Sequence, residues 1–403
     1  MIIKPAHRTE NVLEYYFSGK LKEIAAMNRE LSDKGQEKVI NLGIGAPDGM
    51  PPTEAIEALC SAAKMTGNHA YQSYTGLPEL RKAFADWYGR YYGVKLNSDN
   101  EIQPLVGSKE GILLISLAFV DKGDKVLVPD PGYPTYSSAS KLVEAEIITY
   151  DLKEENNWWP DFEALEKIDL TGVKIMWTNY PNMPTGADAS EELYRKLADF
   201  GNRHNILIVN DNPYSFILND RPVSILAAAG AKRCCIELNS LSKAHNMSGW
   251  RIGMVAGEAE IISNILKVKS QMDSGMFKPL QLAAIAALGQ SHEWFKSLNA
   301  EYRRRKSLAA KIFDTIGASY DKDTKGLFLW GRIDPDNPLA TERSDNGKSL
   351  GERVSDRILY EAGVFITPGF IFGRNGDNYI RISLCAGEAV LERANEKIKQ
   401  IID

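Results

Sequence analysis

Short apolar runs alternate with amphipathic helical segments along most of the chain. Runs typical of buried strands occur at 125–128, 146–150, 173–178, 206–209, 234–238 and 252–256. Apolar residues recur at helical spacing over 54–64, 77–92, 108–120 and 191–202. Strands that alternate with helices favour right-handed βαβ units and a largely parallel sheet.

The last third of the chain has a different pattern. Three helical segments, 261–271, 280–287 and 292–316, follow one another. Two strand-like runs then appear at 326–331 and 379–384, flanked by helices near 350–361 and 388–401. We therefore predict an α/β protein, with a large domain whose mostly parallel sheet lies between helices and a smaller α+β domain. The predicted divisions are an N-terminal arm with part of the small domain (1–45), the large domain (46–290) and the C-terminal small domain (291–403).

The N-terminal arm carries an apolar face at helical spacing, formed by Leu21, Ile24, Met27 and Leu31. An arm this apolar is expected to pack on the body of its own chain or on a partner subunit.

Composition excludes several classes of protein. The chain has 403 residues, is 44% hydrophobic and 25% charged, and carries a formal net charge of -5. This balance is typical of a soluble globular protein and gives no basic surface for nucleic acid. The longest apolar run, 112–120, is too short to span a bilayer, and the first residues lack the apolar stretch of a signal peptide.

The cysteines and histidines point away from disulfide and metal chemistry. The four cysteines, Cys60, Cys234, Cys235 and Cys385, are few and scattered, so we expect reduced packing residues of a cytoplasmic protein. The five histidines show no spacing typical of metal ligands.

Polar side chains gather after the predicted strands, where ligands bind in open parallel sheets. Lys243 follows one strand directly, among small polar residues and near Arg251, and both desolvation and a nearby positive charge lower an ammonium pKa. The other strand ends and helix starts of the large domain supply Ser108, Lys109, Tyr133, Asn182, Asp211, Tyr214, Ser240 and Ser242. Each alone has an ordinary structural explanation. Together they match one ligand, pyridoxal 5'-phosphate, which has a phosphate, a flat ring, a ring nitrogen, a phenolic oxygen and an aldehyde.

Four motifs carry a resemblance to a known family. They are Pro184-Thr185-Gly186, Asp211-x-x-Tyr214, Ser240-x-Ser242-Lys243 with Arg251, and Arg381 near the end. In this order, between Asn41 and Ser383, they resemble the class I/II pyridoxal-phosphate aminotransferases of the aspartate aminotransferase superfamily (fold type I). The resemblance implies a homodimeric enzyme that moves an amino group between an L-amino acid and a 2-keto acid by a ping-pong Schiff-base mechanism.

The resemblance also implies a role for each position. Lys243 would bind the cofactor aldehyde and move the proton, and Asp211 would keep the pyridine nitrogen protonated. Tyr214 and Asn182 would hold the phenolic oxygen, and Tyr133 would stack on the ring. The phosphate would be held by Ser108, Lys109, Ser240, Ser242, Arg251 and, from the neighbouring subunit, Tyr71. Arg381 would bind the substrate carboxylate as a fork, with Gly45 allowing close backbone approach and Asn182 nearby.

One position departs from the family pattern. The family usually has Asn directly before Pro-Thr-Gly, whereas this chain has Met183 preceded by Asn182. Either the loop is shifted by one residue, so that Asn182 supplies the amide, or the amide contact is lost. We expect the shift to Asn182.

Alternatives remain open for both the substrate and the reaction type. The segment 273–277 with Gln281 resembles a subgroup that includes LL-diaminopimelate aminotransferases, but hydrophobic donors, aspartate and glutamate stay open. A C–S β-lyase, a related elimination enzyme or an enzyme that closes an aminocyclopropane ring could use the same fold and lysine. A non-catalytic cofactor-binding sensor would need a fused DNA-binding module, for which the chain before Asn41 is too short.

Overall fold

The large sheet of this computed structural model has seven strands. The structure describes residues 3–10, 12, 16–340 and 347–402. In sheet order the strands are β2 (Ile102–Leu105), β8 (Gly253–Ala256), β7 (Cys235–Ser240), β6 (Leu207–Asp211), β5 (Val173–Thr178), β3 (Lys125–Asp130) and β4 (Glu146–Asp151). Only β8 runs antiparallel to its neighbours, β2 and β7, and the other pairs are parallel. The predicted α/β class with a mostly parallel sheet is confirmed.

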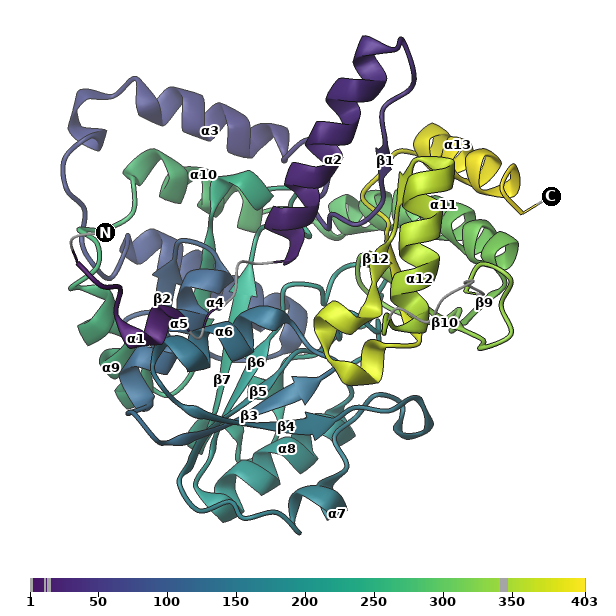
Figure 1. Cartoon of the computed structure of the whole chain (residues 1–403). Coiled ribbons are helices and arrows are strands. Elements are labelled where there is room, and N and C mark those ends of the chain that lie inside the picture. Colours follow the sequence, from purple (N-terminus) through teal and green to yellow (C-terminus); the bar gives the residue numbers. More distant parts are fainter. Residues whose placement is uncertain (1–2, 11, 13–15, 341–346, 403) are drawn as a thin grey trace.

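Helices cover both faces of this sheet (Figure 1). The helices of this part of the chain are α3 (Thr53–Ala63), α4 (Pro78–Tyr92), α5 (Ser108–Phe119), α6 (Pro134–Leu142), α7 (Phe162–Leu165), α8 (Glu191–His204), α9 (Ala259–Lys269) and α10 (Lys278–Leu288). Of these, α10 packs on α4, and α3 packs on α10 rather than on the sheet. Side chains alternate across a strand, so Ile175 and Trp177 of β5 join the core under α5, α6 and α9, while Met176 joins the core under α4 and α8. Burial on both faces explains why these strands read as continuous apolar runs.

A second, antiparallel sheet lies beside the first. Its order is β12 (Thr367–Pro368), β13 (Tyr379–Ser383), β10 (Phe328–Ile333) and β9 (Ala318–Tyr320). It is accompanied by α11 (His292–Ile316), α12 (Leu350–Arg357) and α13 (Glu388–Lys399), shown in green and yellow in Figure 1. The domain boundaries at 45/46 and 290/291 stay predictions.

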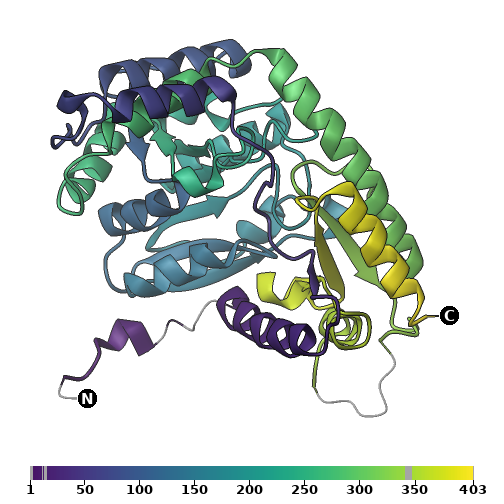
Figure 2. The same ribbon diagram turned by 90° about the horizontal axis from the view of Figure 1, so that it is seen from above.

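The N-terminal arm joins this second part of the molecule. It comprises α1 (His7–Glu10), α2 (Tyr16–Asp33) and β1 (Ile40–Asn41), and β1 pairs in parallel with β11 (Val364–Phe365). On α2, Ile24 packs with Leu359 and Phe365 of the C-terminal region. Figure 2 shows α2 lying alongside the C-terminal elements, so the arm packs on its own chain.

Candidate active site

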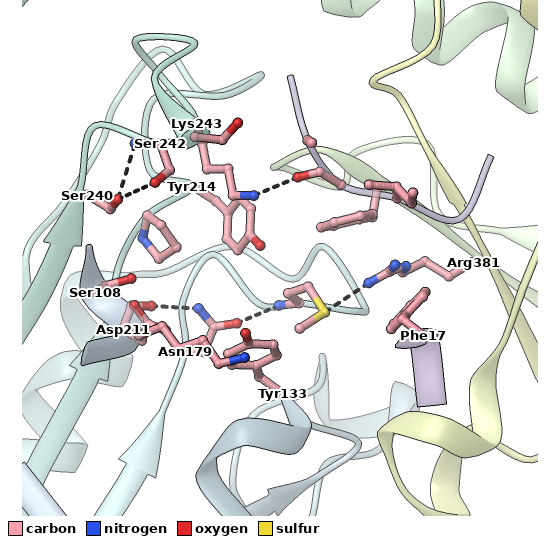
Figure 3. A pocket seen from close by; sticks show the side chains of 18 of the residues that line it. Phe17, Ser108, Tyr133, Asn179, Asp211, Tyr214, Ser240, Ser242, Lys243 and Arg381 are labelled. Atoms are coloured by element: carbon pink, nitrogen blue, oxygen red, sulfur yellow. Dashed lines mark hydrogen bonds between the residues drawn. The ribbon is translucent and has the colours of Figure 1, made fainter. Parts of the chain in front are cut away.

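A cavity of about 490 Å³ opens where the carboxyl ends of the large sheet face the second sheet. Figure 3 shows its side chains converging from both parts of the molecule. Most of the residues singled out from the sequence line it: Gly45, Ser108, Lys109, Tyr133, Asp211, Tyr214, Ser240, Ser242, Lys243, Arg251 and Arg381. They are far apart in the sequence, and the strand ends bring them together.

Lys243 lies in the turn that follows β7. Its Nζ donates a hydrogen bond of 2.6 Å to the Gly45 carbonyl and stands 5.8 Å from the centre of the Tyr214 ring. Burial lowers the pKa of Lys243, and the positive charges of Arg381 and Arg251 act in the same direction. A lysine with a lowered pKa more readily supplies the neutral amine that attacks a carbonyl.

Asp211 is the last residue of β6 and is almost fully buried. Its Oδ2 accepts a hydrogen bond from the Tyr136 hydroxyl at 3.0 Å, while its Oδ1 is buried without a hydrogen-bond partner in the part of the chain that the structure describes. Burial raises the pKa of Asp211 to about 7. A buried carboxylate oxygen of this kind needs a donor, and a protonated ring nitrogen is one.

Hydroxyls and a guanidinium form an anion site at the end of β7. The Ser240 Oγ donates to the Ser242 Oγ at 2.8 Å, and Arg251 Nη1 lies 3.4 Å from the same Ser242 oxygen. Ser108 begins α5 beside them, so the backbone N–H groups of that helix start also face the site. This combination suits a phosphate.

Arg381 comes from β13 at the opposite side of the cavity and is 4% exposed. Its Nη2 donates to the Gly43 carbonyl at 2.7 Å and its Nη1 to the Met183 Sδ at 3.2 Å. Three aromatic rings surround the guanidinium, with centres 3.9, 4.7 and 5.7 Å away, contributed by Phe328, Phe372 and Phe17. An arginine fork held in this way can bind a carboxylate with both donors.

The two sides of the cavity match one family of enzymes. The model of "aminotransferase class I and II" matches residues 37–398. The chain belongs to this family. The LL-diaminopimelate aminotransferases of Dehalococcoides mccartyi and Aquifex aeolicus are similar to it, at 41% identity (98% of both chains) and 40% identity (96% of this chain and 99% of the relative). The substrate-bound BacF structure from Bacillus subtilis has a TM-score of 0.88 and 34% identity, and the match covers 100% of this chain and 98% of that one.

Members of this family depend on pyridoxal 5'-phosphate, and this chain is a pyridoxal-phosphate-dependent aminotransferase. The residues present fit that cofactor. Asp211 offers an unbound buried oxygen to a ring nitrogen, Lys243 offers an amine to the aldehyde, and Ser240, Ser242 and Arg251 offer an anion site to the phosphate. In the described ranges, no group of three or more potential metal ligands is present and no helix is long and apolar enough to cross a membrane.

Asn182 does not occupy the place that we expected for it. Its Oδ1 accepts hydrogen bonds from the Thr185 backbone N–H and hydroxyl, and its Nδ2 donates to the Asn179 carbonyl. The amide therefore closes its own loop, and the neighbouring Met183 lines the cavity instead. Asn182 is not among the lining residues, and its role at the phenolic oxygen stays a prediction.

Tyr71 is the other residue that the structure does not bring to this cavity. Its side chain is 91% exposed, and it is not among the lining residues.

Several lining residues were missed from the sequence. Asn179 follows β5 directly and donates 2.6 Å to the Asp211 carbonyl, so its place at a strand end was a usable signal. Tyr136 lies within α6, and its position in the sequence gave no such signal. Phe17, Phe328 and Phe372 line the cavity only because the N-terminal arm and the second sheet fold over it.

Proposed function

We propose that this aminotransferase moves an amino group between an L-amino acid and a 2-keto acid, with Lys243 carrying the proton. The observation that supports it most directly is the opposition of Lys243, with its lowered pKa, and Asp211, with its unbound Oδ1, in one cavity. When bound, the cofactor supplies an aldehyde and a ring that withdraws the electrons left on the substrate α-carbon.

Each side chain then has a defined task. Lys243 takes the proton from the substrate α-carbon and later delivers it to the cofactor carbon that carried the aldehyde. Asp211 holds a proton on the ring nitrogen, since a carboxylate beside it favours the charged form. Tyr133 would pack on the ring, Tyr214 would donate to the phenolic oxygen, and the phosphate would be held by Ser108, Lys109, Ser240, Ser242 and Arg251.

Arg381 binds the substrate α-carboxylate in this proposal. Arg381 and Lys243 donate to the carbonyls of Gly43 and Gly45, respectively. Carbonyls two residues apart are at most about 7 Å from each other. The amine and the guanidinium therefore lie at neighbouring points of one short segment and can contact the two ends of one α-amino acid.

The comparisons favour transamination over elimination. The relatives are named as aminotransferases, and nothing in the cavity favours a C–S β-lyase. Because several relatives are named for LL-diaminopimelate, that compound is the first named donor to test.

We infer that the chain forms a homodimer in which Tyr71 reaches the phosphate of the partner's cofactor. Tyr71 belongs to a set of exposed apolar side chains at neighbouring segments, which also includes Met50, Met65, Tyr74, Met272 and Phe277. These residues flank α3 and α10, which lie side by side in Figure 1. A large exposed apolar area marks an interaction surface.

The cytoplasm is the compartment that we propose for the protein. All four cysteines are free, and three of them are buried. Proteins of reducing compartments keep their thiols in this form.

Removal of the Lys243 amine tests the function. The Lys243→Ala variant should still bind pyridoxal phosphate, but without a borohydride-reducible covalent attachment, and its kcat should fall by at least about 100-fold. Absorbance, borohydride reduction followed by mass spectrometry, and turnover with a panel of amino acids and 2-oxoglutarate provide the measurements. Lys267→Ala, on the exposed face of α9, is the matched control. Wild-type protein that gains no visible absorbance band with pyridoxal phosphate, or a Lys243→Ala variant that keeps its activity, would contradict the proposal.

A further inference from the structure

The charges that line the cavity are unevenly placed. Among the residues that the structure describes, the lining has the cations Lys109, Lys243, Arg251 and Arg381 and one carboxylate, Asp211. Arg251 lies on Ser242 at the anion site, with Lys109 next to Ser108 at the start of α5. Asp211 lies at the deep end, bound to Tyr136. In the proposed function Lys243 is assigned to the cofactor aldehyde and Arg381 to the substrate α-carboxylate.

The wall on the substrate side is apolar. It is built from Phe17 and Leu21 of α2, Ile44 between the two carbonyls that hold Lys243 and Arg381, and Phe328 and Phe372 around the guanidinium. Leu21 and Ile44 are 38% and 40% exposed, which places them at the mouth. An amino acid held between Lys243 and Arg381 has its α-carbon beside Ile44. Its side chain therefore meets this wall, to which we refer as the mouth wall.

We propose that the mouth wall selects amino donors with an apolar side chain, aromatic or branched aliphatic, over donors with a second charge. This inference rests on the proposed function. Apolar side chains gain from leaving water against Phe17, Leu21 and Ile44. A second ammonium or carboxylate, as in lysine, glutamate or LL-diaminopimelate, would lose water there without meeting an opposite charge among the described lining residues.

Binding of inert carboxylic acids tests the proposal without turnover. Isothermal titration of the holoenzyme should give 3-phenylpropionate an affinity at least about tenfold higher than glutarate or 6-aminohexanoate, because one pocket contact of this size separates substrates by 10-fold or more. Equal or tighter binding of glutarate or 6-aminohexanoate would overturn the proposal. It would do so even if the opposite charge came from a partner subunit.

A charge placed on the mouth wall should reverse the preference. Leu21 is partly exposed, so Leu21→Arg adds a cation at the mouth without burying it. The ratio of 3-phenylpropionate to glutarate affinity should fall at least about tenfold in this variant. Ala25→Arg adds the same charge one turn further along α2, at an exposed position outside the cavity lining, and should leave the ratio unchanged. An unchanged ratio in folded Leu21→Arg would show that the mouth wall does not contact the side chain.

Turnover separates this inference from the proposed function. With 2-oxoglutarate as acceptor, phenylalanine or leucine should show a higher kcat/KM than LL-diaminopimelate, glutamate or lysine. Preference for LL-diaminopimelate would overturn the inference and leave the aminotransferase proposal intact. Absence of transamination with every donor, in a protein that binds 3-phenylpropionate as expected, would contradict the proposed function instead.

Discussion

Asp211 shows how one buried side chain can be prepared for a ligand. One of its oxygens accepts a hydrogen bond from Tyr136, and the other has no hydrogen-bond partner among the described residues. Burial without a full set of donors makes the charged form unfavourable and raises the pKa to about 7. The carboxylate is thus unfavourable in the protein alone and becomes favourable beside a protonated ring nitrogen.

The pH dependence of the free energy of unfolding should reveal this raised pKa of Asp211. In cofactor-free protein the unfolded Asp211 ionises near pH 4, whereas the folded one ionises near pH 7. The unfolded state therefore binds fewer protons between these values, so stability falls as the pH rises. Between pH 5 and 7 this group should remove about 2–3 kcal/mol from the free energy of unfolding, and the change should level off by about pH 8. Urea unfolding at each pH measures it.

Asp211→Asn is the control for this titration. The variant should lack this part of the slope and gain stability over the wild type as the pH rises from 5 to 7. Parallel pH profiles of the two proteins would mean that the carboxylate is not buried as described.

Met183 illustrates a local substitution with a wider effect. At a position where the family usually carries an amide, the thioether accepts a hydrogen bond from Arg381 at 3.2 Å. A thioether is a weak acceptor, so it holds the guanidinium loosely enough for a carboxylate to replace it.

At the level of elements, the turn between β2 and α5 depends on a glycine, because a side chain at this position would collide with a neighbouring residue. Gly107 has φ of +77°, and Arg251 Nη2 occupies the place where a Cβ at this position would stand. The glycine thus lets the arginine pass behind the start of α5 to reach the anion site.

Gly107→Ala should therefore weaken cofactor binding. Displacement of Arg251 removes a charged hydrogen bond from the phosphate, and we expect an affinity at least about tenfold lower by absorbance titration. Gly123→Ala is the control, because Gly123 has φ of +88° and nothing within 4 Å of an added Cβ. Both variants should lose about 1–3 kcal/mol of stability from backbone strain. If Gly107→Ala kept wild-type cofactor affinity, as Gly123→Ala should, the proposed role of Arg251 in holding the phosphate would be wrong.

Elements with strong local patterns were predictable from the sequence, and those defined by partners were not. The apolar runs of β3, β5, β6 and β7 are buried on both faces and end in polar residues, so both the sheet and most of the site followed from them. β2 was missed because it is short, contains Pro104 and is a strand only through its pairing with β8. The conformation of the loop after β5 could not be predicted, because the hydrogen bonds that Asn182 makes to Thr185 leave no trace in composition or spacing.

At the scale of the whole molecule, the N-terminal arm completes a cavity that neither sheet forms alone. Phe17 and Leu21 of α2 and Gly43 to Ala46 close one side of it, and Arg381 of the second sheet closes another. Such long-range placement depends on how the parts pack, and only the family resemblance could suggest it from the sequence.

Mixing two inactive variants tests the proposed exchange of Tyr71 between subunits. Tyr71→Ala and Lys243→Ala should each have low activity as homodimers. In a mixed dimer, one site would combine the intact Lys243 of one chain with the intact Tyr71 of the other. Random subunit exchange should therefore restore about a quarter of the wild-type activity per chain.

The outcome depends on which site Tyr71 serves. If Tyr71 acted on its own subunit's cofactor, every site in the mixture would lack one residue and activity would stay low. Sedimentation of the unmixed proteins, which should run as dimers, completes the test.

The grouping of cations around the cavity also affects how quickly substrates arrive. Among the described residues, four cationic side chains and one carboxylate line it, in a chain whose formal net charge is -5. Even with a phosphate dianion in place, the crevice stays less negative than the surface around it. Field lines that converge on such a crevice draw in carboxylates over roughly one Debye length, about 8 Å at physiological salt. Keto acids, which carry a net negative charge at neutral pH, would be captured faster than their zwitterionic amino-acid counterparts, and added salt would reduce that advantage.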